Sequence, residues 1–182
     1  KTTTCTTPSI PVGRFYDSAW LGDVLYVVRK IYGEDTPDLH KYNIASDKWS
    51  ILPIPFESTR RQSCRVFAIE NRIYLYGGRE GRISFNPFNW ISPHESGYND
   101  YYVSDGLVFN PITNKCSPMA KNNFSGKRAR YGVQQIVEVV DGALIHVDDN
   151  EEAQLYSAKK DQWMVLPDFK LPFELDEIRC EL

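Results

Sequence analysis

Short runs of aliphatic and aromatic residues, separated by turn-forming residues, recur along most of the chain. In residues 65 to 81, RVFAIENRIYLYGGREG, the runs at 66 to 69 and 73 to 76 flank a turn, and Gly77-Gly78 ends the second run. Apolar runs of this length, bounded by turn signals, predict β-strands, and here they predict a hairpin. Helical periodicity is nearly absent, so an all-β chain is expected.

Two further runs complete a predicted four-stranded unit. The third covers residues 106 to 110, and the fourth begins near Cys116. The pattern has echoes elsewhere, and recurrence at a fixed period is the signature of a repeat architecture. An aromatic residue precedes a particular position by seven residues in three places: Tyr42 before Trp49, Phe109 before Cys116, and Tyr156 before Trp163.

These features resemble the kelch-repeat family, whose units carry a small-residue doublet after the second strand, an aromatic residue in the third and a Trp in the fourth. The resemblance covers about residues 12 to 167. The repeats depart from the family pattern, because Arg29-Lys30 and Asp148-Asp149 replace the doublet in the first and third units, and Cys116 replaces Trp. The resemblance implies a kelch-type β-propeller segment of about three four-stranded antiparallel blades plus a partial strand.

Three blades do not close a ring, so the resemblance implies that the chain belongs to a larger, usually six-bladed, propeller. The alternative is that two copies assemble into one ring. We expect Trp49 and Trp163 to be buried between neighbouring blades, and Cys116 to leave room that a neighbour fills. Residues 1–182 are expected to form one propeller segment, divided as follows: 1–11 the outer strand of a preceding blade, 12–53 a blade, 60–119 a blade with an irregular insertion at 79–105, 127–167 a blade, and 168–182 a tail or the start of a next blade.

Composition and charge exclude several function classes. The 182 residues are 42% hydrophobic and 13% aromatic, which is enough to bury a core, so the chain is expected to be globular. The formal net charge of −3 argues against nucleic acid as a partner. No apolar run approaches the ~20 residues that span a bilayer, so no membrane association is expected. The four cysteines form no CxxC pair and are interpreted as free thiols, with two disulfides as the alternative.

Basic residues gather in the segments expected to join successive blades. In the family, these segments share one face of the disc with the loops between the second and third strands, and that face is usually where partners bind. Guanidinium groups grip carboxylates bidentately, so such a surface suits an acidic protein or peptide. The candidate partner-binding residues in and beside these segments are Arg14, Arg60, Arg61, Lys127, Arg128 and Arg130, and Arg65 and Lys121 lie in the same two segments. A structural role for the arginines before the inner strands is the alternative.

The insertion at 79–105 supplies the other candidates. A long segment inside a compact repeat is usually functional or disordered, and its aromatic content argues against disorder. Trp, Tyr and Arg are the commonest hot-spot residues of protein interfaces. We therefore add Arg79, Arg82, Trp90 and Tyr98 to the candidates. The alternative is that the aromatics only pack the insertion against its own blade.

No catalytic pattern is present in the sequence. His40, His94 and His146 are widely separated, and GxSxG, HExxH and phosphate-binding glycine motifs are absent. We therefore expect no enzyme activity, no metal and no cofactor. The resemblance implies a cytoplasmic protein-interaction module, such as the substrate-binding propeller of a BTB-BACK-kelch adaptor that engages a cullin-3 ubiquitin ligase through domains outside this sequence. Alternatives are an actin-binding kelch protein and a propeller of a secreted oxidase or glycan-binding protein.

Overall fold

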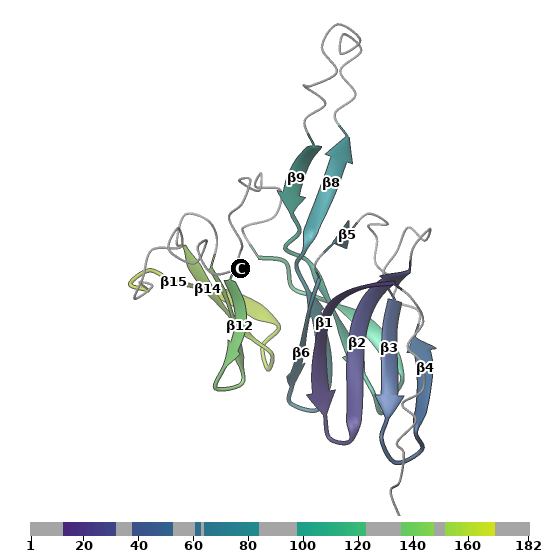
Figure 1. Ribbon diagram of the computed structural model, residues 1–182. Helices are drawn as coiled ribbons and strands as arrows, with labels where there is room; N and C mark the ends of the chain where they lie inside the picture. The colour runs from purple at the N-terminus through teal and green to yellow at the C-terminus, as the bar shows by residue number, and fades with distance from the viewer. Residues whose placement is uncertain are drawn as a thin grey trace, which may run out of the picture.

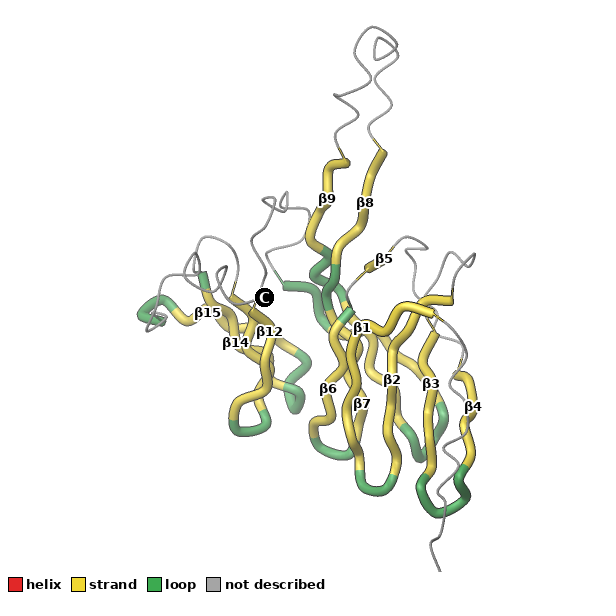
Figure 2. Tube along the Cα trace, in the orientation of Figure 1, coloured by secondary structure: helices red, strands yellow, loops and turns green. Residues whose placement is uncertain are grey.

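A computed structural model describes residues 13–31, 38–52, 61–62, 64–83, 98–122, 136–147 and 152–169. These ranges contain fifteen β-strands and no helix (Figure 1 and Figure 2). It follows that no helix in them is long and apolar enough to cross a membrane. The expected strand at 1–11 and the tail beyond residue 169 lie outside the described residues.

Twelve of the strands form three four-stranded antiparallel sheets that follow one another along the chain, as the sequence predicts. The first sheet consists of β1 (Gly13–Leu21), β2 (Val24–Ile31), β3 (Asp38–Asn43) and β4 (Lys48–Leu52). The second consists of β6 (Arg65–Ile69), β7 (Arg72–Tyr76), β10 (Gly106–Asn110) and β11 (Lys115–Met119). The third consists of β12 (Ile136–Val140), β13 (Ala143–Val147), β14 (Ala153–Ser157) and β15 (Gln162–Leu166).

Asp141 and Gly142 form the tight turn between β12 and β13. Asp141 and Gly142 both have positive φ, 49° and 76°. Two successive residues with positive φ match the right-handed twist of a hairpin, and Asp-Gly is a preferred pair for this geometry. In the second sheet Glu70 and Asn71 make the same kind of turn with φ of 47° and 61°.

The seven-residue spacing found in the sequence is a cross-strand pairing. In each sheet the third and fourth strands are joined by a four-residue turn, and the two residues seven apart are direct partners: Tyr42 with Trp49, Phe109 with Cys116, and Tyr156 with Trp163. The turn ends each time in a left-handed residue, Asp47, Asn114 or Asp161, with φ of 52°, 55° and 49°. A constant turn length therefore explains the constant spacing.

The remaining strands form a small sheet, the ribbon, which consists of β5 (Arg61–Gln62), β8 (Arg79–Ile83) and β9 (Tyr98–Tyr102). The prediction that Gly77-Gly78 ends the second run is confirmed, because β7 ends at Tyr76, but the prediction that residues 79–105 are irregular was wrong at Arg79–Ile83 and Tyr98–Tyr102. The positive φ of the two glycines, 69° and 102°, redirects the chain, and the amide of Val103 bonds the carbonyl of Gly78 at 3.0 Å. Strand pairing then resumes, and the ribbon extends away from the three stacked sheets (Figure 1).

The second sheet lies between the other two and is buried on both faces. Because side chains alternate along a strand, Ile73 and Leu75 of β7 face the first sheet, and Tyr74 and Tyr76 face the third. The buried residues of the first seam, between the first and second sheets, are Tyr26, Val28, Leu39, Cys64, Val66, Ile73, Leu75, Leu107 and Phe109. Those of the second seam, between the second and third sheets, are Phe67, Ile69, Tyr74, Tyr76, Val108, Met119, Val137, Leu144 and Tyr156.

The two tryptophans that were expected to be buried between neighbouring sheets are only half-buried. Trp163 packs at the edge of the second seam, and it is only half-buried because it lies on β15, the outermost strand of the third sheet. Trp49 lies on the face of the first sheet that contributes to neither seam. Cys116 is half-buried beside the first seam.

Candidate interaction surface

The ribbon brings together candidate residues that are far apart in the sequence. Arg61 pairs with Glu80 in the register of β5 and β8, which places it beside Arg79 and Arg82 of the same strand. Across the ribbon, Tyr98 pairs with Ile83. Four of the ten predicted partner-binding residues therefore lie in one three-stranded sheet.

The remaining candidates divide into two groups. Arg14 lies in β1 opposite Lys30, and β1 starts on the side of the stacked sheets from which the ribbon extends (Figure 1). The others lie outside the described residues, and they are Arg60, Trp90, Lys127, Arg128 and Arg130.

Acidic residues interrupt the basic character of the ribbon. Glu80 and Asp100 lie in the same two strands as Arg79 and Arg82, so these strands carry two charges of each sign. Strand pairing also places Glu80 directly opposite Arg61. The sequence of these strands is therefore mixed in charge rather than uniformly basic.

A buried polar network holds the base of the ribbon. Tyr76, the last residue of β7, has its hydroxyl 2.7 Å from Nδ1 of His146, and the side-chain amide of Asn122 donates to that hydroxyl. Nδ2 of Asn122 also lies 2.8 Å from Nδ1 of His146. An amide nitrogen can only donate, so Nδ1 of His146 is the acceptor of the bond from Asn122.

This network connects three parts of the chain. The backbone amide of Asn122 bonds the carbonyl of Ser104, and the hydroxyl of Ser104 donates to the carbonyl of Asn122. Ser104 lies between β9 and β10, and Tyr76 directly precedes the glycines that lead into β8. The segment that enters β8 and the segment that leaves β9 are therefore both tied to the third sheet through His146. Buried, mutually satisfied polar groups rigidify the structure around them.

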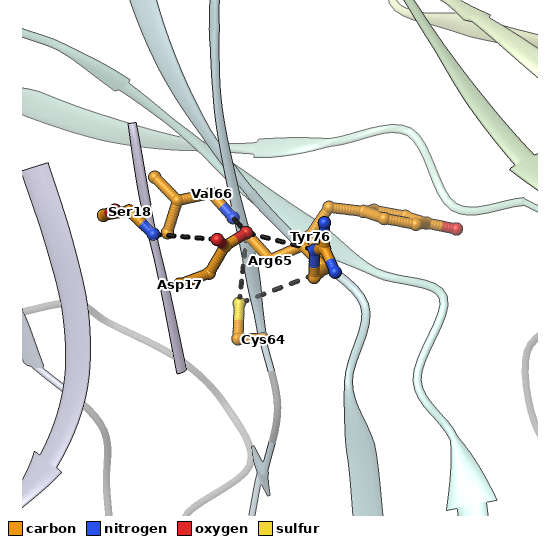
Figure 3. Close-up of polar contacts among 6 residues, drawn as sticks. All are labelled: Asp17, Ser18, Cys64, Arg65, Val66 and Tyr76. Carbon is orange, nitrogen blue, oxygen red and sulfur yellow. Dashed lines mark hydrogen bonds and ion pairs between the residues drawn. The ribbon is translucent and has the colours of Figure 1, made fainter. Parts of the chain in front are cut away.

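A second polar contact ties the first sheet to the second (Figure 3). Asp17 follows an irregularity in β1, and its Oδ2 accepts from the amide of Val66 at 2.9 Å. The same oxygen lies 3.0 Å from Nε of Arg65, so the two side chains form an ion pair. Oδ1 of Asp17 accepts from the amide of Ser18 at 2.9 Å. Arg65 thus lies in a strand and makes an ion pair, and the interpretation of it as a cation of a joining loop was wrong.

Asp17, Asn122 and Tyr76 were missed by the sequence analysis. Asp17 and Val66 are 49 positions apart, and Tyr76 and Asn122 are 46 positions apart, so no local pattern reveals these contacts. Among the described cysteines, Cys64 is buried and Cys116 is half-buried. Burial raises the pKa of the Cys116 thiol, which makes it a poor nucleophile. In the described ranges no three His, Cys, Asp or Glu residues are placed to hold a metal ion.

The comparisons with known proteins add to the evidence on the fold. No family profile and no curated protein matches the sequence. Among solved structures the chain is similar to that of YjhT, with a TM-score of 0.62 and 16% identity over 91% of this chain. The match covers 54% of the YjhT chain, so this chain spans about half the length of the structure it resembles. At this identity the likeness shows the fold alone.

Proposed function

We propose that the chain is a segment of a kelch-type β-propeller that recognises a protein partner through the ribbon and the chain around it. Two observations support the propeller. Three four-stranded sheets stack in chain order with equivalent faces pointing the same way, and the pairing of the third and fourth strands is repeated in each sheet. The first and third sheets each leave one face without a sheet in the described residues. A larger ring would cover both faces.

The ribbon is the single observation that carries protein recognition. It interrupts the second sheet between β7 and β10, and the neighbouring sheets have no counterpart in the described residues. Its strands contain three arginines and three tyrosines, and these residue types are among those that contribute most to protein interfaces. Its base is fixed by the network around Tyr76, so binding to it would cost little ordering entropy.

The kelch resemblance favours a particular setting for this activity. In that setting the propeller is the substrate-binding part of a cytoplasmic adaptor for a cullin-3 ubiquitin ligase, and the partner is a protein or peptide with acidic groups. Arg79 and Arg82 would pair with those groups, and the ribbon tyrosines would supply apolar contact area. The chain itself acts in this proposal as a binding module without catalytic, metal or cofactor chemistry.

The test is a comparison of two double charge reversals in the complete protein. Arg79→Glu with Arg82→Glu alters the ribbon, and Lys115→Glu with Lys159→Glu changes the charge by the same amount at two exposed positions of the second and third sheets. Proteins captured from cell extract are quantified by mass spectrometry for each form. We expect a set of captured proteins to fall by about tenfold or more with the ribbon variant and to persist with the control.

Two results would contradict the proposal. Equal loss of the captured proteins with both variants would show that charge in general, and not the ribbon, governs capture. Retention of every captured protein by the ribbon variant would place recognition elsewhere on the molecule. If cullin-3 is among the captured proteins, and its capture requires segments outside this sequence, the result would support the adaptor setting over the actin-binding and secreted alternatives.

A further inference from the structure

The outermost strand of the third sheet, β15, differs in composition from the outermost strands of the other two sheets. A strand at the edge of a sheet presents backbone groups that could pair with another chain, and lysine or proline residues commonly protect it. β4 begins at Lys48, and β11 begins at Lys115 and contains Pro118. β15 has the sequence QWMVL, with no charged residue and no proline. It is therefore the least protected of the three edges.

β15 is also regular and exposed. All five of its residues pair with β14 without a shift in register. In the described part of the chain it pairs with no other strand, because it ends the order β12-β13-β14-β15. The side chains of Met164 and Val165 are 43% and 60% exposed. An exposed, regular and apolar edge of this kind is a template for a further strand.

The turn before β15 determines which backbone groups point outward. The amide of Lys160 bonds the carbonyl of Ser157 within the turn, and Ser157 and Gln162 close the turn as direct partners. The closing pair of such a hairpin is hydrogen-bonded, and hydrogen-bonded and non-hydrogen-bonded pairs alternate along an antiparallel ladder. Every second residue from Gln162 onward therefore bonds β14, whereas the backbone groups of Trp163 and Val165 point away from it.

This edge is complementary to itself. When two copies of β15 run antiparallel with their Met164 residues opposite each other, Trp163 of each copy meets Val165 of the other. The outward backbone groups of both strands pair in this register. Aromatic and β-branched residues that face each other across strands stabilise a sheet. The two Trp163–Val165 pairs lie on one face and the two Met164 side chains on the other, because side chains alternate along a strand.

The turns on either side of β15 add charge complementarity. In the same register, the turn that precedes β15 in one copy lies beside the turn that follows β15 in the other. The first turn carries Lys159 and Lys160, the second carries Asp168, and all three residues are exposed. The two-fold symmetry of the pair produces this contact between opposite charges twice. The chain therefore contains both halves of the contact.

We propose that β15 is a self-association site, at which a second copy of this chain adds its own β15 and joins the third sheets of the two copies into one continuous antiparallel sheet. The contact is edge to edge. Successive sheets of a ring stack through their faces, so ring closure does not use this edge. The inference is therefore independent of ring closure and of what the ribbon binds.

The test is sedimentation equilibrium of the 182-residue chain from about 5 to about 500 µM, a range suited to the weak association of a small contact. We expect the average mass to rise from that of the monomer toward that of the dimer. Val165→Lys places a charge in the edge and should weaken dimerisation by about tenfold or more. The matched control is Val140→Lys, because Val140 is 50% exposed and lies in β12, at the opposite edge of the same sheet. The control should dimerise as the unsubstituted chain does.

A charge exchange tests the register. Lys160→Glu places like charges beside Asp168 of the other copy, and Asp168→Lys places like charges beside Lys160. Each single change should weaken dimerisation by about threefold or more at low salt. The double variant restores opposite charges and should dimerise as the unsubstituted chain does. These positions are exposed, so the melting temperature should not change, and the exchange decides the question even if Val165→Lys fails to fold.

Three results would overturn the proposal. The first is a chain that stays monomeric at the highest concentration. The second is association that Val140→Lys abolishes and Val165→Lys leaves intact, because the contact would then involve another part of the third sheet. The third is a double charge variant that remains as weak as the single variants, because the register centred on Met164 requires the exchange to restore dimerisation.

Discussion

The second sheet meets the first through mainly aliphatic side chains, but it meets the third through tyrosines and hydrogen bonds. The alternation of β7 sends Ile73 and Leu75 to one side and Tyr74 and Tyr76 to the other. In the second seam the rings of Tyr76 and Trp163 lie 5.1 Å apart, and those of Tyr76 and His146 lie 5.5 Å apart.

The difference follows from what each seam has to position. Burial of aliphatic surface is non-directional, so the first seam can hold two sheets together without fixing a particular atom. Hydrogen bonds are directional, and those of Tyr76, Asn122 and His146 fix the chain where the ribbon leaves the second sheet. The apolar seam therefore mainly supplies stability, and the polar seam also supplies the orientation of the candidate binding surface.

Truncation in the first seam should have the largest effect. Leu75 is fully buried among residues of both sheets, and Leu75→Ala should lower the free energy of unfolding by about 3 kcal/mol through lost burial and the cavity that remains. Urea titration measures the change. Ile112→Ala, at a side chain that is 89% exposed, is the control and should change little. A loss no larger for Leu75→Ala than for the control would mean that the first seam is not a packed core.

A hydroxyl deletion should distinguish the two seams. Tyr76→Phe removes the group between His146 and Asn122 and should lower the free energy of unfolding by about 2 kcal/mol, because buried polar partners remain. Tyr26→Phe is the matched change in the first seam, where no hydrogen bond of the described chain involves the hydroxyl, and it should cost less than about 0.5 kcal/mol.

The same variant has a local signature that a purely global loss would not produce. Hydrogen exchange of the Val103 amide, which bonds the carbonyl of Gly78 at the base of the ribbon, should accelerate in Tyr76→Phe more than exchange in β2. Equal acceleration at both places, or equal destabilisation by the two Tyr→Phe changes, would contradict the assignment of orientation to the polar seam.

The strands of the three sheets could be predicted because their determinants are local. Alternating apolar runs, the Asp141-Gly142 turn and the constant spacing from Tyr156 to Trp163 each depend on neighbours within a few residues. The ribbon could not be predicted in the same way. Its strand β8 pairs with β5 and with β9, whose residues lie fifteen or more positions after their partners. The Gly77-Gly78 pair predicts the end of a strand, but it does not show that the chain turns there into a new strand.

The candidate site was predictable by residue type and only partly by position. Arg61, Arg79, Arg82 and Tyr98 were selected because arginines and aromatics gathered in unusual segments, and the ribbon places them in one sheet. The groups that fix the ribbon were not predictable. The contacts of His146 with Tyr76 and Asn122 arise only when two sheets separated by a long connection meet.

Alkaline pH should weaken the second seam through Tyr156. Burial, and then the hydrogen bond to the Asp161 carboxylate, raise the pKa of Tyr156 above its ordinary value of 10.0. Its contribution is fully present below pH 10 and is lost as the pH rises further, because the unfolded chain ionises first while the folded chain keeps the proton. Stability should therefore fall above pH 10 by up to about 1.4 kcal/mol per pH unit from this residue.

The measurement is a series of urea titrations from about pH 9 to about pH 11, which bracket the ordinary tyrosine pKa. Tyr156→Phe should be less stable at the lower pH, because it loses the bond to Asp161, and its stability should fall less steeply as the pH rises. Tyr26→Phe should flatten the slope less, since burial alone raises the pKa of Tyr26. Parallel slopes for Tyr156→Phe and the unsubstituted chain would contradict the prediction.

The smallest effect is expected at the polar contact of the first seam, between Asp17 and Arg65. The side chains are 24% and 43% exposed, so solvent screens the ion pair, and Asp17→Asn should cost only about 0.5 kcal/mol. That cost should largely vanish at 1 M salt, where the Debye length is about 3 Å.

Asp17→Ala also removes the acceptor of the Val66 amide and should cost about 1 kcal/mol more, independently of salt. The asparagine variant retains a carbonyl oxygen for that amide, so the difference between the two variants separates the backbone hydrogen bond from the charge. If Asp17→Asn instead costs as much as Tyr76→Phe, the first seam depends on directional contacts as the second does, and the contrast between the seams does not hold.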